Sequence, residues 1–148
     1  MTKYLPCIYL ALALVLSGCS GASEPTDPPT LAKCYAAEFG QSPLAGITNL
    51  QARQVVVGDA GAAWLRFEAN SNIVTQLVSS RFAPSERAKF IEESIGGNIP
   101  RWWRPEEDEL TDFYICNQWR SDTNHYSVAV LAHDIRQHVI YFHHAISF

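Results

Sequence analysis

The sequence lacks an apolar run long enough to cross a bilayer. A membrane-spanning helix needs about 20 apolar residues, and the longest run, residues 5–16, has 12. This run follows one basic residue, Lys3. Its length and position are typical of the hydrophobic region of a signal peptide rather than of a membrane span.

Motifs of well-known enzymes and clusters of basic residues are also missing. There is no Gly-x-Ser-x-Gly, His-Glu-x-x-His, phosphate-binding glycine loop or Ser-x-x-Lys. The formal charge is −4 at pH 7. An acidic chain without a basic patch disfavours binding to nucleic acid and electrostatic binding to anionic lipid. Two carboxylates brought together by the fold could still form a hydrolase, so an enzyme is kept as an alternative.

The residues Leu16-Ser17-Gly18-Cys19 come at the end of the apolar run. Small residues followed by cysteine at this place resemble the lipobox of bacterial lipoproteins. The resemblance implies cleavage before Cys19, a diacylglycerol on its sulfur and a further acyl chain on the new N-terminus. An ordinary secretory site, which is Ala-x-Ala-like, fits these residues less well. Ser20 follows the predicted lipidated cysteine. By resemblance to enterobacterial sorting rules, a serine at this position implies that the protein is sent to the outer membrane, where it faces the periplasm.

Three segments follow from this interpretation. Residues 1–18 are expected to be a cleaved signal peptide. Residues 19–30, with three prolines in SGASEPTDPPT and little to bury, are expected to be a lipidated, flexible tether. Residues 31–148 are expected to form one globular domain, which resembles only uncharacterised small bacterial lipoproteins.

Two cysteines remain in the predicted domain. Cys34 and Cys116 form an even pair in an exported and therefore oxidising compartment, which predicts a disulfide between them. The alternative is two buried free thiols. No further ligand flanks either cysteine, so we expect no zinc site there and no cofactor.

The hydropathy pattern predicts an α+β domain with an antiparallel sheet of about five strands and helices packed on one face. The strands are expected at residues 55–57, 64–69, 113–119, 126–133 and 138–146. Helices are expected at residues 30–39, from residue 71, at residues 84–95 and, briefly, at the acidic residues 106–109. The last two strands are expected to pair with His133 opposite His138. The order of the strands is left open.

The segment 98–105 is a proline-bracketed loop in which Arg101, Trp102, Trp103 and Arg104 are candidate partner-binding residues. Tryptophan and arginine are enriched at the energetic centres of interfaces. The alternative is that one ring closes the core while the other lies against the surface. Trp119 alternates with core positions and is expected in the core.

Histidines offer a weaker candidate site. His133, Asp134 and His138 could share a metal at the end of a hairpin, although a second segment rich in ligands is missing. An ordinary polar hairpin end is the simpler interpretation. His143 and His144 are neighbours in a strand, so they are expected on opposite faces.

Together these features predict a lipid-anchored envelope protein that acts as a non-catalytic protein-binding module. An inhibitor, an immunity-type protein and an assembly accessory all fit. The alternatives are a metal-dependent or hydrolytic envelope enzyme and a purely structural lipoprotein.

Overall fold

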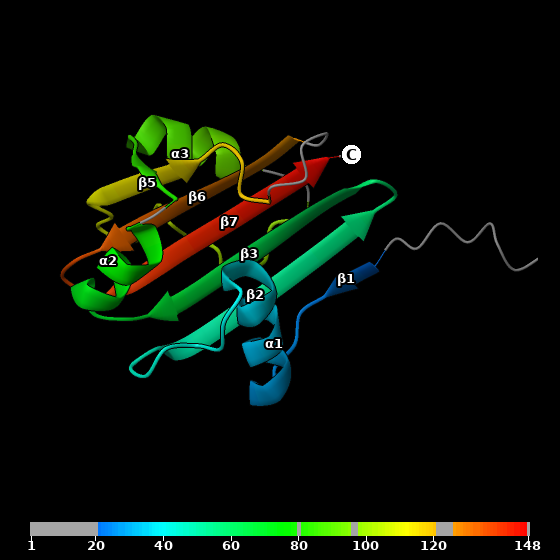
Figure 1. Cartoon of the computed structure of the whole chain (residues 1–148), viewed down its shortest axis with the longest axis horizontal. Helices are drawn as coiled ribbons and strands as arrows, with labels where there is room; N and C mark the ends of the chain where they lie inside the picture. The colour runs from blue at the N-terminus through cyan, green and yellow to red at the C-terminus, as the bar shows by residue number, and fades with distance from the viewer. Residues whose placement is uncertain (1–20, 80, 96–97, 121–125, 148) are drawn as a thin grey trace, which may run out of the picture.

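A computed structural model describes residues 21–79, 81–95, 98–120 and 126–147. The described residues contain three helices and seven strands (Figure 1). In chain order these are β1 Gly21–Ser23, α1 Pro28–Phe39, β2 Thr48–Val57, β3 Ala60–Glu68, α2 Ser71–Val78, β4 Ala83–Pro84, α3 Arg87–Ser94, β5 Asp112–Cys116, β6 Tyr126–Asp134 and β7 Val139–Ser147.

All strands belong to one antiparallel sheet with the order β1-β2-β3-β7-β6-β5-β4. The five predicted strands correspond to β2, β3, β5, β6 and β7. The sheet has two more strands than predicted because β1 and β4, of 3 and 2 residues, pair at its edges. Strands this short carry little periodicity, so the sequence pattern does not predict them.

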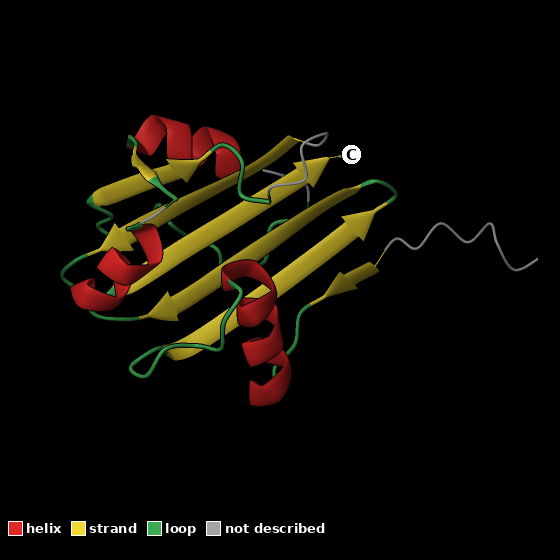
Figure 2. Ribbon diagram, viewed as in Figure 1, coloured by secondary structure: helices red, strands yellow, loops and turns green. Residues whose placement is uncertain are grey.

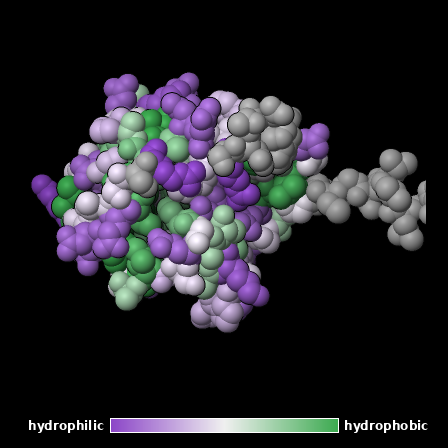
Figure 3. Space-filling model, viewed as in Figure 1, coloured by the Kyte–Doolittle hydropathy of each residue, from purple (hydrophilic) through white to green (hydrophobic). Residues whose placement is uncertain are grey.

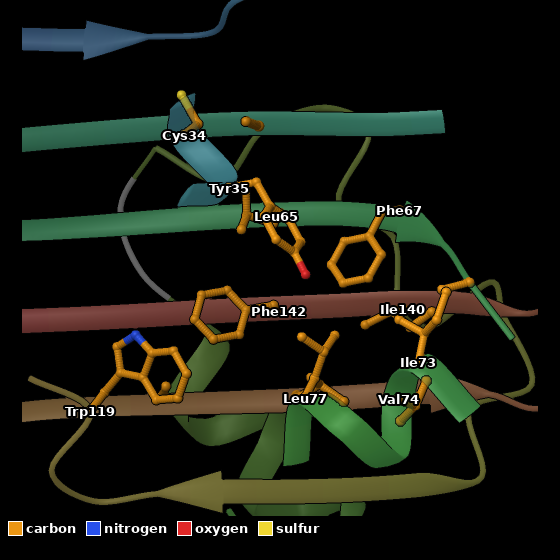
Figure 4. Packing of buried hydrophobic residues seen from close by; sticks show 14 of the residues in the cluster. Cys34, Tyr35, Leu65, Phe67, Ile73, Val74, Leu77, Trp119, Ile140 and Phe142 are labelled. Carbon is orange, nitrogen blue, oxygen red and sulfur yellow. The ribbon is translucent and has the colours of Figure 1, made fainter. Parts of the chain in front are cut away.

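Helices pack on both faces of the sheet, not on one face as predicted. On one face α1 and α2 cover the odd residues of β3 and the even residues of β7; they lie in front of the sheet in Figure 2. Figure 4 shows this core around Tyr35, Leu65, Phe67 and Phe142. On the other face Phe90 of α3 packs with Trp103 of the loop 98–105 and with side chains of the alternate strand positions, including Trp64, Val130 and Tyr141. The central strands are therefore apolar on both faces, as in other sheets covered on both sides.

The first helix begins before residue 30, where it was predicted to start. Asp27 caps α1, and its side chain accepts the Thr30 amide at 3.0 Å. Gly40 ends the helix in the left-handed conformation, directly after the predicted last residue, 39. The segment expected as a tether is thus partly ordered, because β1 pairs with β2 and α1 starts at Pro28.

The helix predicted at residues 84–95 is present as α3 but is shorter, because Pro84 lies in β4. α3 buries Phe90 and Ser94. The short helix predicted at residues 106–109 is wrong, since residues 106 and 107 lie in a turn, residue 108 in a bend and residue 109 in neither. The Asp108 carboxylate accepts a hydrogen bond of 2.6 Å from the Tyr141 hydroxyl, so one of these acids is held by the sheet instead of by a helix dipole.

The hairpin of β6 and β7 is two residues out of the predicted register. His133 pairs with Ile140, and Asp134 pairs with Val139, which leaves a turn of residues 135–138. Asp134 fixes this turn: its Oδ1 accepts the amides of Arg136 and Gln137 at 2.8 and 2.9 Å. A shift of two residues keeps each side chain on its predicted face.

Among the residues that the structure describes, no helix is both long and apolar enough to cross a membrane.

Candidate functional site

A buried polar cluster lies where the last turn of α1 meets the start of β6 and the second half of β7. Glu38 comes from the last turn of α1, Ser127 from the start of β6 and His144 from β7. His144 pairs with Ala129, and Ser127 pairs with Ile146, so the two polar side chains are diagonal neighbours on the α1 face of the sheet. All three residues are buried.

The three side chains form a hydrogen-bonded relay. His144 Nδ1 lies 2.9 Å from Glu38 Oε2, and Ser127 Oγ lies 2.9 Å from His144 Nε2. A carboxylate only accepts, so Nδ1 carries a proton toward Glu38; in the neutral imidazole Nε2 is then the nitrogen that accepts from the serine hydroxyl. The Ser127 oxygen also accepts the backbone amide of Arg120 at 3.0 Å.

Two neighbouring residues complete the coordination of the carboxylate. Trp119 Nε1 donates to Glu38 Oε2 at 3.3 Å, and Arg120 Nη2 donates to Glu38 Oε1 at 3.3 Å. A buried carboxylate is tolerated only where charge and hydrogen bonds replace water. Glu38 therefore joins α1 to β7 and to the segment after β5, and His144 extends the network to Ser127 of β6.

A surface groove of about 340 Å³ opens beside this cluster. Its lining combines four polar residues, Glu38, Gln54, Arg120 and His144, with small and apolar residues, among them Val56, Ala63 and Ile146. The volume is at the lower end of the range for small-ligand pockets, and apolar walls with a few fixed polar groups are typical of binding sites. Ser127 does not line the groove.

The aromatic loop is less accessible than its sequence suggests. Trp103 is buried, with its ring centroid 5.0 Å from that of Tyr141 in an edge-on contact. Trp102 is half-buried, and its Nε1 donates to Glu24 Oε1 at 2.7 Å. Of the four candidate residues, Arg101 and Arg104 are exposed, and Arg104 is paired with Glu107 at 3.0 Å. One ring thus closes the core, and the other lies against the segment before α1.

His133, Asp134 and His138 do not converge on a metal. His133 is buried and lies 3.7 Å from Asp112, while Asp134 is occupied by the turn and His138 is exposed. Burial lowers the pKa of His133. Within the described ranges, no group of three or more histidine, cysteine, aspartate or glutamate residues could hold a metal ion.

The predicted disulfide between Cys34 and Cys116 is not formed in the structure. Both are buried free thiols. Cys34 Sγ lies 3.7 Å from Gln54 of β2, whereas Cys116 ends β5, and β3, β7 and β6 lie between these strands. Four strand spacings amount to roughly 19 Å, and a disulfide requires Cα atoms within about 7 Å. Burial, and then the nearby Glu38 carboxylate, raise the pKa of Cys34.

The sequence carried one signal for this cluster. Glu38 occupies the same helical stripe as Cys34 and Tyr35, and a carboxylate on a buried stripe needs a partner. That partner, His144, is 106 residues away and is identified only when the register of β7 and the position of α1 are known. The expectation that His143 and His144 face opposite sides of the sheet is confirmed, since His143 contacts Trp64 in the other core.

No protein-family model matches this chain, and no curated protein and no solved structure matches it either.

Proposed function

We propose that this chain is a lipid-anchored envelope protein whose domain binds a protein partner without catalysis. The lipobox-like residues Leu16–Cys19 support the anchor. The groove beside Glu38 supports the binding role, because its lining combines hydrogen-bonded polar residues with apolar ones. We place recognition at this groove rather than at the loop 98–105, where Trp103 is buried and Arg104 is already paired.

The polar residues of the groove are held in place by hydrogen bonds before any partner binds. Glu38 is held by His144 and Trp119, and Arg120 is anchored to both Glu38 and the carbonyl of Ala37. The Arg120 side chain is still about half exposed, at 47%. An arginine with a fixed position and a free surface is suited to an acceptor of the partner, such as a carbonyl or carboxylate, at little entropic cost.

Site-specific photocrosslinking in cells tests where the partner binds. A photoreactive residue would replace Gln54 in the groove, Arg101 in the loop or, as a control, exposed Glu92 on α3. The proposal expects one abundant crosslinked protein from position 54 and none from positions 101 and 92. A crosslinked protein at position 101 alone would show that the partner binds at the loop 98–105 instead of the groove. No protein partner at either position would contradict the binding role.

The relay favours a second candidate function, hydrolysis by an activated serine. The order Ser127 Oγ, His144 Nε2, His144 Nδ1 and Glu38 matches that of catalytic triads, in which histidine takes the hydroxyl proton as oxygen attacks a carbonyl carbon. Ser127 is 2% exposed, however, and does not line the groove. Burial of the nucleophile makes binding the better-supported function.

A fluorophosphonate probe separates the two candidates. Binding alone predicts that the folded protein stays unlabelled. Labelling at Ser127 that disappears in Ser127→Ala and is reduced in His144→Gln would establish the hydrolase and reject the non-catalytic proposal. Ser85, which lies outside the relay, is the matched control serine, and Ser85→Ala should change nothing.

A further inference from the structure

The first described strand covers only a small part of the edge to which it is bound. β1 pairs with Gln54, Val55 and Val56, three of the 10 residues of β2. Beyond these pairs, residues 48–53 of β2 form the edge of the sheet (Figure 1), and in the described part of the chain no strand pairs with their outer side. The sequence explains why β1 stops. Pro25 follows Glu24, and proline has no amide hydrogen with which to continue the ladder.

Packing holds β1 only loosely. All of its residues are exposed, and a Cβ added at Gly21 would meet nothing within 4 Å. Two surface cavities flank the segment. One, of about 210 Å³, is lined by Gly21, Ala22 and residues 55–57, and the other, of about 250 Å³, by residues 24–26, residues 50–52 and Trp102. Close-packed contacts, which hold other elements in place, are therefore few along this segment.

The main side-chain attachment of the segment comes from Glu24. Its Oε2 accepts from Arg53 Nη1 and its Oε1 accepts from Trp102 Nε1, each at 2.7 Å. The next step of the β1–β2 register sets Glu24 opposite Arg53. The Glu24 side chain is 40% exposed, and ion pairs at exposed positions stabilise little. Arg53 Nε is buried without a hydrogen-bond partner among the described residues, so Glu24 leaves the guanidinium partly unsatisfied.

The same edge continues the groove beside Glu38. Gln54, Val55 and Val56 pair with β1 and also line that groove. Val56 stays 50% exposed although β1 lies beside it, and Figure 3 shows hydrophobic surface next to the point where the described chain begins. A partner segment in the groove therefore lies beside the backbone groups of β2 that β1 occupies.

We propose that the partner adds an extended strand to β2 in place of β1, with an acidic side chain that takes the position of Glu24 against Arg53 and Trp102. The inference rests on the proposed protein-binding function and gives its mode, which is strand addition. A strand without proline at the position of Pro25 continues the ladder to Gln51, where a bulge interrupts β2. Backbone hydrogen bonds then provide affinity, and Arg53 with the apolar groove residues selects the side chains.

A synthetic peptide tests this exchange on the full protein, purified in detergent. The fluorescent peptide Gly-Ala-Ser-Glu-Val-Thr-Asp repeats residues 21–27 with Pro25→Val. Because β1 belongs to the same chain, it competes at a roughly millimolar effective concentration. The peptide is therefore titrated against Glu24→Lys, in which the ion pair with Arg53 is lost, and against wild type.

A cross-strand disulfide supplies the matched control protein. Ala22→Cys together with Val55→Cys, in the Glu24→Lys background, would hold β1 on β2, because paired strand residues are close enough for this bond. Reduction of the same protein releases the strand. A second peptide, with lysine in place of its glutamate, tests the role of Arg53.

The proposal expects fluorescence anisotropy to show several-fold tighter binding to Glu24→Lys than to wild type. The oxidised disulfide protein should not bind, and reductant should restore binding. The lysine peptide should bind several-fold more weakly, because it brings a like charge to Arg53. Equal binding before and after reduction, equal binding of both peptides, or no binding to Glu24→Lys would overturn strand addition.

The crosslink at position 54 distinguishes this failure from failure of the proposed function. A partner crosslinked there, together with a failed peptide exchange, would overturn strand addition and leave the groove as the binding site. No partner at position 54 or 101 would overturn the protein-binding role and this inference with it.

Discussion

Glu38 accepts hydrogen bonds from three side chains in two segments of the chain: His144 in β7, and Trp119 and Arg120 after β5. Glu38→Ala leaves two buried donors without an acceptor, which we expect to cost roughly 3–5 kcal/mol of unfolding free energy. Glu38→Gln keeps one acceptor oxygen and should cost about 1–3 kcal/mol. Urea unfolding of both variants measures the difference. Equal losses would show that the carboxylate oxygens are not what holds α1 on the sheet.

His143 lies in the opposite core, against Trp64, and burial lowers its pKa to about 4. The unfolded chain, with a histidine pKa near 6.5, binds a proton between pH 6.5 and 4 that the folded protein does not bind. The folded protein therefore loses stability as pH falls through this window, by roughly 2–3 kcal/mol at pH 4.5. Buried His133 contributes in the same direction.

Replacement of His143 isolates this effect from the titration of carboxylates. In His143→Leu the drop in unfolding free energy between pH 7 and pH 4.5 should shrink by about 2 kcal/mol. Urea unfolding at both pH values, with wild type alongside, is the measurement. The exposed His138→Leu is the control and should retain the full drop. An unchanged drop in His143→Leu would mean that His143 is protonated in the folded state.

At the scale of single elements, the β6–β7 turn carries strain that the sequence does not reveal. His138 has φ of 59°, a left-handed conformation that costs a residue with a Cβ roughly 1 kcal/mol. Its carbonyl accepts the amide of Ala69, so the conformation is held by the neighbouring strand connection. His138→Gly should raise the unfolding free energy by about 0.5–1 kcal/mol, measured by thermal or urea unfolding.

His138→Ala is the matched variant for the same turn, since alanine also removes the imidazole but keeps a Cβ. It should give no gain in stability. A gain as large as that of His138→Gly would assign the effect to loss of the histidine side chain and not to the backbone.

The elements themselves were largely predictable, because periodicity is a local property. Leu65 and Phe67 share one face of β3 as the alternation predicts, and Ile73 and Leu77 share the buried face of α2. Register was not predictable to the same degree. The hydrophobic pattern of β6 and β7 is satisfied equally well by registers two residues apart, so the Asp134 turn decides between them.

The candidate site depends on long-range order, and for that reason most of it was missed. Neither Ser127 nor His144 differs in sequence context from other polar residues of a strand. Their pairing needs the register of β6 and β7, and their link to Glu38 needs the position of α1 on the sheet. The predicted disulfide failed for the same reason. The cysteine count and the predicted exported compartment suggest a bond, but the strand order separates Cys34 from Cys116.

At the scale of the whole molecule, the two thiols report on the two lateral halves of one sheet. Cys34 and Cys116 contribute to the same core cluster although they lie near β2 and in β5. The described strands form one sheet, and a small single domain unfolds cooperatively, so both thiols should become reactive at the same urea concentration. Cys34→Ser and Cys116→Ser, each with one thiol left, allow the two labelling midpoints to be compared.

Neither thiol should react in the native soluble domain, and two per chain should react after denaturation without reductant. A disulfide would leave the denatured, unreduced chain unlabelled, and different midpoints would divide the sheet into two parts that open separately, one on each side of β3 and β7.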